Sequence, residues 1–348
     1  MVSKHSDHQM MLHEQGEITK MCEFTGIDVS KEKFDIGWLR DVKTGKKKTK
    51  VFKNTAVGHQ QTKEWLLKNI KVPAEDIIIT LEPTGVYHEA LLYFLHDCGF
   101  QILLVNPGKA RKYAESMNQI HKTDKLDAIT LAWYGHAQQH KLTLWQPEAP
   151  EIRELKVMIR RLDALEKDLQ REQNRQEAAL VSLSSDRVAQ SLKDMIETLK
   201  AEIQRLQQDI DNHIDRFPEL KRNRQLLQSI KGIGTVMSRE LVYLFASKRF
   251  KSAKQAAAYL GLIPKLRESG KLKGRTMLSK IGSARLRAKL YMAAVCASTH
   301  NPDIKAQKVR LLKAGKVKMQ ALGAAMRKLI QICFGVIKHQ CEYQPQLV

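Results

Sequence analysis

The strongest constraint on the fold is a long series of aliphatic residues with the spacing of a helical seam. Leucine and isoleucine alternate at intervals of four and three residues, at positions Leu192, Ile196, Leu199, Ile203, Leu206 and Ile210. A similar series begins earlier, at Ile152, Leu155, Ile159 and Leu162. This period is typical of a coiled coil. Residues 182–186 between the two series predict a turn, so we expect either an antiparallel helical hairpin or a pair of dimerising helices within residues 148–216.

Residues 23–147, before this seam, alternate short apolar segments with amphipathic ones. Buried strands are predicted at 24–29, 34–39, 48–52, 77–81 and 102–105, and helices at 62–69, 87–98 and from 124 to about 136. Three strands followed by helix, strand, helix, strand and helix is the order of a ribonuclease-H-like domain, so we predict an α/β fold here. Residues 1–22 are polar and are expected to form a disordered tail.

Four acidic residues fall at the ends of these predicted elements. Asp28 ends the first strand, Glu82 follows the fourth, and Asp124 and Asp127 share one face at the start of a helix. If the first and fourth strands are neighbours, the four carboxylates converge. Carboxylates are ligands for Mg²⁺ or Mn²⁺, and a pair of such ions can stabilise both the attacking and the leaving oxygen in phosphoryl transfer. The plainer alternative is that each acid only occupies a polar turn or a helix N-terminus.

The composition indicates a polyanionic partner. Lysine and arginine number 59 against 37 aspartate and glutamate residues, which gives a formal charge of +22 and makes nucleic acid the default partner. Aromatic residues make up 6%, so contacts to phosphate are expected to outweigh base stacking. The five cysteines are scattered without a CxxC pair, and we identify no apolar run long enough to span a bilayer. We therefore expect a cytoplasmic protein with no membrane partner.

Residues 217–348 are predicted to form a compact, all-α domain with two stretches of interest. Gly232 and Gly234 resemble the hairpin of a helix-hairpin-helix element, in which backbone amides approach a phosphate. A plain turn between helices is the alternative. Ser269 lies in a basic loop, and a serine hydroxyl that attacks a phosphate needs a base or a metal together with cations. A flexible basic loop is the alternative. Candidate nucleic-acid contacts are Lys231, Gly232, Gly234, Lys271, Arg275, Lys280, Arg285 and Arg287.

These motifs together resemble the DEDD transposases of bacterial insertion sequences, a family that includes bridge-RNA-guided recombinases and pilin-gene DNA invertases. The resemblance depends on Asp28, Glu82, the block 122–128, and the later glycine and serine stretches, and it runs from about residue 24 to the C-terminus. It implies a RuvC-like domain whose catalytic metal ligands are Asp28, Glu82, Asp124 and Asp127, and a nucleophile at Ser269.

The resemblance also implies a reaction and its partners. The family cleaves and exchanges double-stranded DNA through a covalent phosphoserine, with Mg²⁺ or Mn²⁺, as homodimers or homotetramers. The tetrad of one subunit is thought to complement the serine of another. A structured guide RNA pairs with DNA in the guided members.

Three alternatives remain open from the sequence. The serine loop is variable, so Ser279 and Ser283 are the next candidates for the nucleophile. A RuvC-like endonuclease that hydrolyses branched DNA would need the four acids but no serine. A basic scaffold that only binds nucleic acid would need neither.

Overall fold

The chain forms two compact units, each with its own hydrophobic core. The computed structural model describes residues 22–83, 85–117, 123–141, 143–182, 185–265, 268–269, 272–273 and 277–346. The units comprise residues 1–147 and 148–348. The expected disordered tail lies outside the described residues, apart from residue 22.

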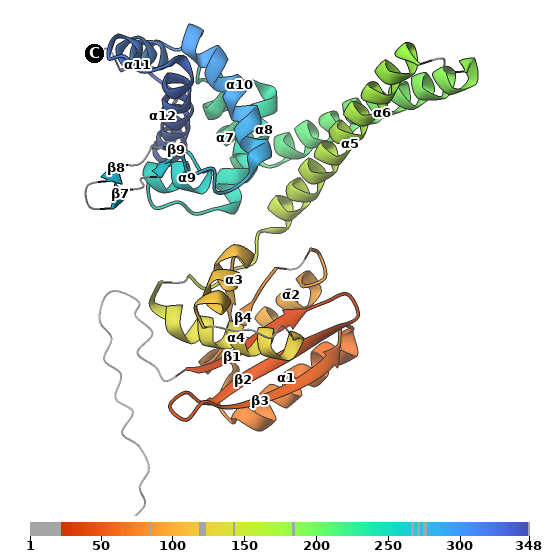
Figure 1. Ribbon diagram of the computed structural model, residues 1–348, viewed down its shortest axis with the longest axis vertical. Coiled ribbons are helices and arrows are strands. Elements are labelled where there is room, and N and C mark those ends of the chain that lie inside the picture. Colours follow the sequence, from red (N-terminus) through yellow and green to blue (C-terminus); the bar gives the residue numbers. More distant parts are fainter. Residues whose placement is uncertain are drawn as a thin grey trace, which may run out of the picture. The chain divides into compact units, whose positions relative to one another are not determined.

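The N-terminal unit is built on a five-stranded sheet with the order β3-β2-β1-β4-β5 (Figure 1). Its strands are β1 (Glu23–Val29), β2 (Lys33–Asp41), β3 (Lys46–Lys53), β4 (Ile77–Leu81) and β5 (Gln101–Leu104). The β1–β2 and β2–β3 pairs are antiparallel, whereas β1–β4 and β4–β5 are parallel. All five predicted strands are confirmed, and this mixed sheet with its connecting helices is consistent with a ribonuclease-H-like domain.

Helices cover both faces of this sheet because the strand residues alternate between two cores. The helices are α1 (Ala56–Ile70), α2 (Glu89–Asp97), α3 (Pro107–Ser116) and α4 (Asp124–Gln138), with short 3₁₀ turns at Ala74–Asp76 and Gln139–Lys141. Along β4, Ile77 and Ile79 pack in the core that α1 and α2 cover, and Ile78 packs with α4 on the other face.

Helix α3 was not predicted. From the sequence, no element is predicted between the fifth predicted strand, 102–105, and the helix from residue 124. In the structure Pro107 is the first residue of α3. Proline is tolerated there because the first helical amide has no intrahelical partner, so the same residue that ends a strand can begin a helix.

Two long helices begin the C-terminal unit. α5 (Pro150–Val181) and α6 (Asp186–Arg216) belong to the same chain and pack against each other as a hairpin (Figure 1). Both helices send aliphatic residues into the core of this unit, and those that are buried include Leu155, Ile159, Ile210 and Ile214. The hairpin alternative is therefore the one that the chain adopts.

The remainder of this unit is mostly helical. Its helices are α7 (Pro218–Gln228), α8 (Thr235–Ser247), α9 (Ala253–Tyr259), α10 (Ala284–His300), α11 (Pro302–Lys313) and α12 (Lys318–His339). The all-α prediction needs a correction, because two pairs of very short antiparallel strands lie between α9 and α10. These are β6 (Pro264–Lys265) with β9 (Met277–Leu278), and β7 (Glu268–Ser269) with β8 (Leu272–Lys273).

Helix α12 also corrects the expectation that no apolar run reaches the length of a bilayer. By length and composition alone α12 could cross a membrane. Half of the most apolar 18-residue segment of this helix is buried inside the protein. It contacts α7, α9, α10 and α11, and Leu329, Ile330 and Cys333 on it are fully buried in the core. Its apolar character is accounted for by its position at the centre of the C-terminal unit.

Candidate active site

Two of the predicted acids, Asp28 and Glu82, lie where two neighbouring parallel strands end, on the same side of the sheet. β1 and β4 are parallel, and Ile27 pairs with Leu81. Asp28 is the next residue of β1, and Glu82 directly follows the end of β4, so the two acids come immediately after a paired position. Strands paired in this way lie about 5 Å apart, which brings the two carboxylates to one place.

Helix α4 adds the other two acids. The Thr123 side chain accepts a hydrogen bond from the Leu126 backbone amide (3.3 Å) and so caps the helix. This cap sets Asp124 and Asp127 in the first turn. The prediction of a helix that begins at Asp124 is confirmed.

Glycine allows α4 to lie directly on the sheet. A Cβ atom added at Gly26 of β1 would meet the Ala128 carbonyl oxygen at 2.1 Å and the Ala132 amide nitrogen at 2.5 Å. A Cβ at Gly135 of α4 would meet Thr80 Oγ1 of β4 at 2.0 Å. Because these two residues have no side chain, α4 can pack close to the sheet. Its first turn then lies near Asp28, which is two residues after Gly26.

The electrostatics of Asp28 indicate that the other three acids lie near it. Burial raises the pKa of Asp28 to about 6, with further contributions from the charges of Asp127, Asp124, Glu82 and Asp35 in that order. The three partners that the sequence analysis assigned to Asp28 are thus its electrostatic neighbours. We call Asp28, Glu82, Asp124 and Asp127 the acidic edge.

Asp35 and Lys33 belong to this region and were missed by the sequence analysis. Asp35 pairs with Asp28 across β1 and β2 and is 2% exposed. Lys33 Nζ donates to Asp124 Oδ2 at 2.8 Å and to Asp35 Oδ2 at 3.4 Å. The signal for Asp35 was present, since it is a carboxylate between two apolar residues of a predicted buried strand. No local pattern could have paired Lys33 with Asp124.

The acidic edge has the chemistry of a site for a hard divalent cation. Its donors are carboxylates, which Mg²⁺ and Mn²⁺ favour. Burial and, after it, the charges of the neighbouring acids raise the pKa of Asp28, and the Lys33 ammonium already lies against Asp124 and Asp35. The donor set therefore fits such an ion. Among the residues that the structure describes, no group of three or more histidine, cysteine, aspartate or glutamate side chains is arranged as a ready metal site.

The predicted nucleophile lies in the other unit, on one of the short strands. Ser269 is exposed and pairs with Leu272 across β7 and β8. The other two candidates are engaged or enclosed. Ser283 caps α10 by accepting from the Leu286 amide at 3.2 Å. The Ser279 hydroxyl oxygen is buried, with no hydrogen-bond partner among the described residues.

The two glycines of the predicted hairpin have different surroundings. Gly232 has a φ of +104°, and a Cβ there would meet the Ala297 backbone of α10 at 2.8–2.9 Å. Its lack of a side chain allows helix packing. Gly234 is exposed, and a Cβ there would meet nothing within 4 Å. It is the N-cap of α8, and no side chain caps the first amide groups of this helix among the described residues. Lys231, beside them, is exposed.

The remaining predicted nucleic-acid contacts divide into three groups. Lys280 is exposed. Lys271 and Arg275 lie outside the described residues. Arg285 and Arg287 are bound within the protein: the Arg285 guanidinium contacts Asp163 of α5 and Glu240 of α8, and Arg287 Nη1 donates to the Gly282 carbonyl at 3.0 Å. Arg285 therefore joins the base of the helical hairpin to α8 and α10.

The sheet order is consistent with the class of ribonuclease-H-like domains, and the acidic edge lies where two of its central strands end. Comparison with known proteins gives the family within this class. Residues 25–184 match the DEDD transposase model, and residues 224–308 match the model described as "Transposase IS116/IS110/IS902 family". The two matched segments contain all four residues of the acidic edge and Ser269.

Full-length relatives agree with the family models. The chain is 30% identical over 327 residues to the "Pilin gene-inverting protein" of Moraxella bovis, which covers 93% of this chain and 98% of the relative. The protein of the same name from Moraxella lacunata gives the same identity and coverage. The chain belongs to the IS116/IS110/IS902 family of transposases and is an enzyme of DNA recombination and transposition. The resemblance found in the sequence is thereby confirmed.

Proposed function

We propose that this protein is the recombinase of an insertion sequence and that it cuts and rejoins double-stranded DNA through a phosphoserine at Ser269. The observation that supports this most strongly is geometric: Asp28 and Glu82 follow the paired residues Ile27 and Leu81 of neighbouring parallel strands, and Asp124 and Asp127 lie in the first turn of the helix that packs on those strands. Asp28, Glu82, Asp124 and Asp127 would hold Mg²⁺ or Mn²⁺. Such ions, when bound, neutralise charge that develops on the phosphate oxygens.

The chemical step assigned to Ser269 is a transesterification. Its Oγ forms a bond to a backbone phosphorus while one P–O bond of the DNA breaks, and the departing oxygen takes up a proton as the serine loses one. A hydroxyl from a second strand reverses the step and releases the serine. The exposure of Ser269 supports this role, because a nucleophile must reach a phosphate outside the protein.

We assign one role to each of three consecutive segments of the chain. Residues 23–147 would form a RuvC-like catalytic domain, 148–216 a coiled-coil arm that dimerises or tetramerises, and 217–348 the domain that carries the serine and a helix-hairpin-helix-like contact to DNA. The exposed Lys231, Gly234 and Lys280 support this last assignment. A structured guide RNA is a proposed partner, which the net charge of +22 supports.

The test is a trapping experiment. The protein is incubated with Mg²⁺, its co-purified RNA and DNA that carries the joined element ends, and denaturing gels and peptide mass analysis are used to search for a DNA adduct. We expect an adduct on Ser269 that is absent without metal and absent from Ser269→Ala. Cleaved DNA with no attached protein would instead establish a hydrolytic RuvC-like endonuclease in which the acidic edge acts without the serine.

A further inference from the structure

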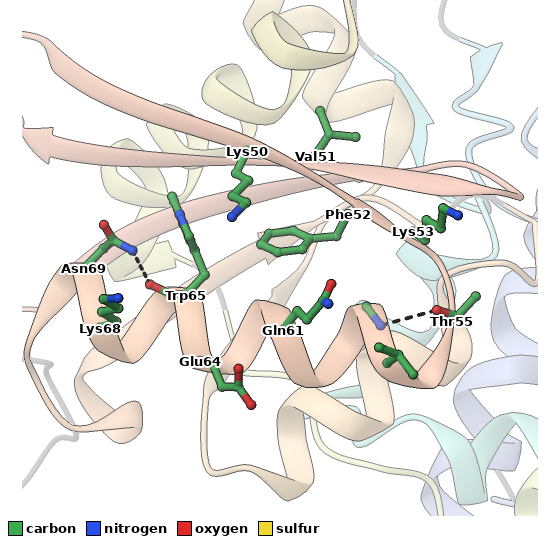
Figure 2. Close-up of a pocket in the computed structure, with 12 residues that line it drawn as sticks. Lys50, Val51, Phe52, Lys53, Thr55, Gln61, Glu64, Trp65, Lys68 and Asn69 are labelled. Atoms are coloured by element: carbon green, nitrogen blue, oxygen red, sulfur yellow. Dashed lines mark hydrogen bonds between the residues drawn. The ribbon is translucent and has the colours of Figure 1, made fainter.

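Strand β3 is the outer strand of the N-terminal sheet on the side opposite β5, and a groove with no assigned role lies beside it. It has a volume of about 860 Å³ and lies between β3 and α1 (Figure 2). From the strand it is lined by Lys50, Phe52 and Lys53, and from the helix by Gln61, Trp65 and Lys68. We propose that this groove binds the sugar-phosphate backbone of a single nucleic-acid strand and leads that strand toward the acidic edge.

The charge of the groove fits this ligand. Strand β3 has the sequence KKKTKVFK, and Lys50, Lys53 and Lys68 are all exposed. Lys48 is also exposed, and its ammonium lies 6.0 Å from the Trp65 ring centre and donates to Asn69 Oδ1 at 2.6 Å. Lysines at this density attract polyanions, and each one that meets a phosphate releases a counterion.

The groove wraps around the edge of the sheet. In Figure 2, Lys50 and Phe52 extend from β3 toward α1. Val51 and Lys53 also line the groove, although alternate residues of a strand point to opposite faces. Residues from both faces line one groove because β3 is the terminal strand of this sheet. Alternate backbone amides of a terminal strand point away from its partner and are available to phosphate oxygens.

The shape of the groove favours one strand over a duplex. One strand and one helix form its walls, and the aromatic floor is closed, since Phe52 is 6% exposed and Trp65 is 9% exposed. Bases therefore cannot stack on these rings, and the contacts are to the backbone. A single strand bends into such a channel, whereas a duplex is stiff over about 150 base pairs. Glu64 on the α1 wall repels phosphate, so the phosphates are expected to follow the β3 side.

One end of the groove adjoins the acidic edge. Lys53 pairs in register with Lys33, whose Nζ contacts Asp124 at 2.8 Å. Beyond Lys53, the Asn54 side chain donates to the Ser30 carbonyl at 3.0 Å, and Ser30 lies two residues after Asp28. A strand that follows the groove past Lys53 therefore arrives beside the proposed metal ligands. The inference does not require the chemistry proposed for Ser269.

The test measures binding without catalysis. Short labelled oligonucleotides of single-stranded RNA, single-stranded DNA and duplex DNA are titrated by fluorescence anisotropy with the full-length protein in EDTA. Lys50→Ala/Lys53→Ala/Lys68→Ala is compared with Lys167→Ala/Lys193→Ala/Lys200→Ala, which removes three exposed lysines from the helical hairpin. We expect the groove variant to bind single strands on the order of 10–100-fold more weakly at 0.15 M salt, with a salt slope lower by about 2.

Val57→Glu provides a second variant that keeps every lysine. Val57 lines the groove and is 68% exposed, so the new carboxylate adds repulsion without disturbing the core. Its binding to single strands should also weaken. The RNA and DNA arms identify the strand. An equal loss in the hairpin control, or a loss confined to duplex DNA, would overturn the proposal.

Discussion

The acidic edge and the serine loop are both candidate reactive centres, but they are held in opposite ways. Asp28 lies within a five-stranded sheet, and α4 is pressed onto that sheet where Gly26 and Gly135 leave no side chain between them. Ser269 lies on a two-residue strand that pairs with β8, and its side chain is exposed. One centre is fixed by the packing of a core, and the other projects from a short ladder of backbone pairs.

This difference suits two different tasks, namely holding the carboxylates in fixed positions and bringing the serine to a phosphate. Carboxylates that repel one another must be held together by something stronger than their own interactions, and here the core of the sheet does this. A nucleophile that must reach a phosphate needs accessibility more than rigidity. Substitutions at the acidic edge should therefore change both stability and activity, whereas substitutions at Ser269 should change activity alone.

The largest effect is expected from Asp124→Asn. Removing one proposed metal ligand should lower the rate of DNA cleavage by about 10²–10³-fold, because several kcal/mol of transition-state stabilisation depend on the bound ion. The rate is measured on duplex DNA with Mg²⁺ or Mn²⁺. Asp97→Asn is the matched control, since this aspartate is exposed on α2 of the same unit. Unchanged cleavage by Asp124→Asn would mean that the acids are structural and would favour the scaffold alternative.

The next effect is on packing, at Gly26. Gly26→Ala forces a methyl group against the α4 backbone and should lower the free energy of unfolding by about 1–3 kcal/mol. Cleavage should fall as well, because Asp124 and Asp127 move with the helix. Both are measured, by urea unfolding and by the cleavage assay. Gly335→Ala in α12 is the control, since a Cβ there meets nothing within 4 Å and should be neutral or stabilising. A stable and active Gly26→Ala protein would contradict the close packing described for α4.

A pair of serines tests the other side of the comparison. Ser283→Ala removes the cap of α10 and should lower the free energy of unfolding by about 1 kcal/mol while strand transfer continues. Ser269→Ala should leave stability within about 0.5 kcal/mol and abolish strand transfer. Thermal unfolding and a strand-transfer assay on the same samples distinguish the two. The reverse pattern would assign the nucleophile to Ser283.

The smallest effect is a pH dependence of stability in metal-free protein. The folded-state pKa of Asp28 is raised from 3.8 to about 6, so its proton favours folding. The contribution is fully present below the unfolded pKa and is lost as the pH rises through about 6. After allowance for the solvent screening of a partly exposed group, we expect about 1 kcal/mol.

Urea unfolding at several pH values, with wild type and Asp28→Asn side by side, measures this contribution. The variant should lack the loss of stability near pH 6, and Mg²⁺ should restore stability to the wild type more at high pH than at low pH. Parallel pH profiles for the two proteins would show that neither burial nor the neighbouring acids raise the pKa of Asp28 in the folded protein.

The predictions from sequence succeeded where the pattern was local. Short apolar segments located all five strands, and the sequence predicted the helix that begins at Asp124. The same patterns failed for α3, because Pro107 suits both the end of a strand and the first turn of a helix. They also missed the short strands around Ser269, whose two-residue length leaves no period to detect.

The sequence by itself determined the order of the elements, the four acids at their ends and the family to which the chain belongs, because these depend on residue types at fixed spacings. Tertiary structure decided which groups meet. Lys33 contacts Asp124 across 91 residues of sequence, and Arg285 contacts Asp163 across 122. It also decided that Gly232 faces α10. Such contacts depend on how whole helices and strands pack, and spacing along the chain does not encode that packing.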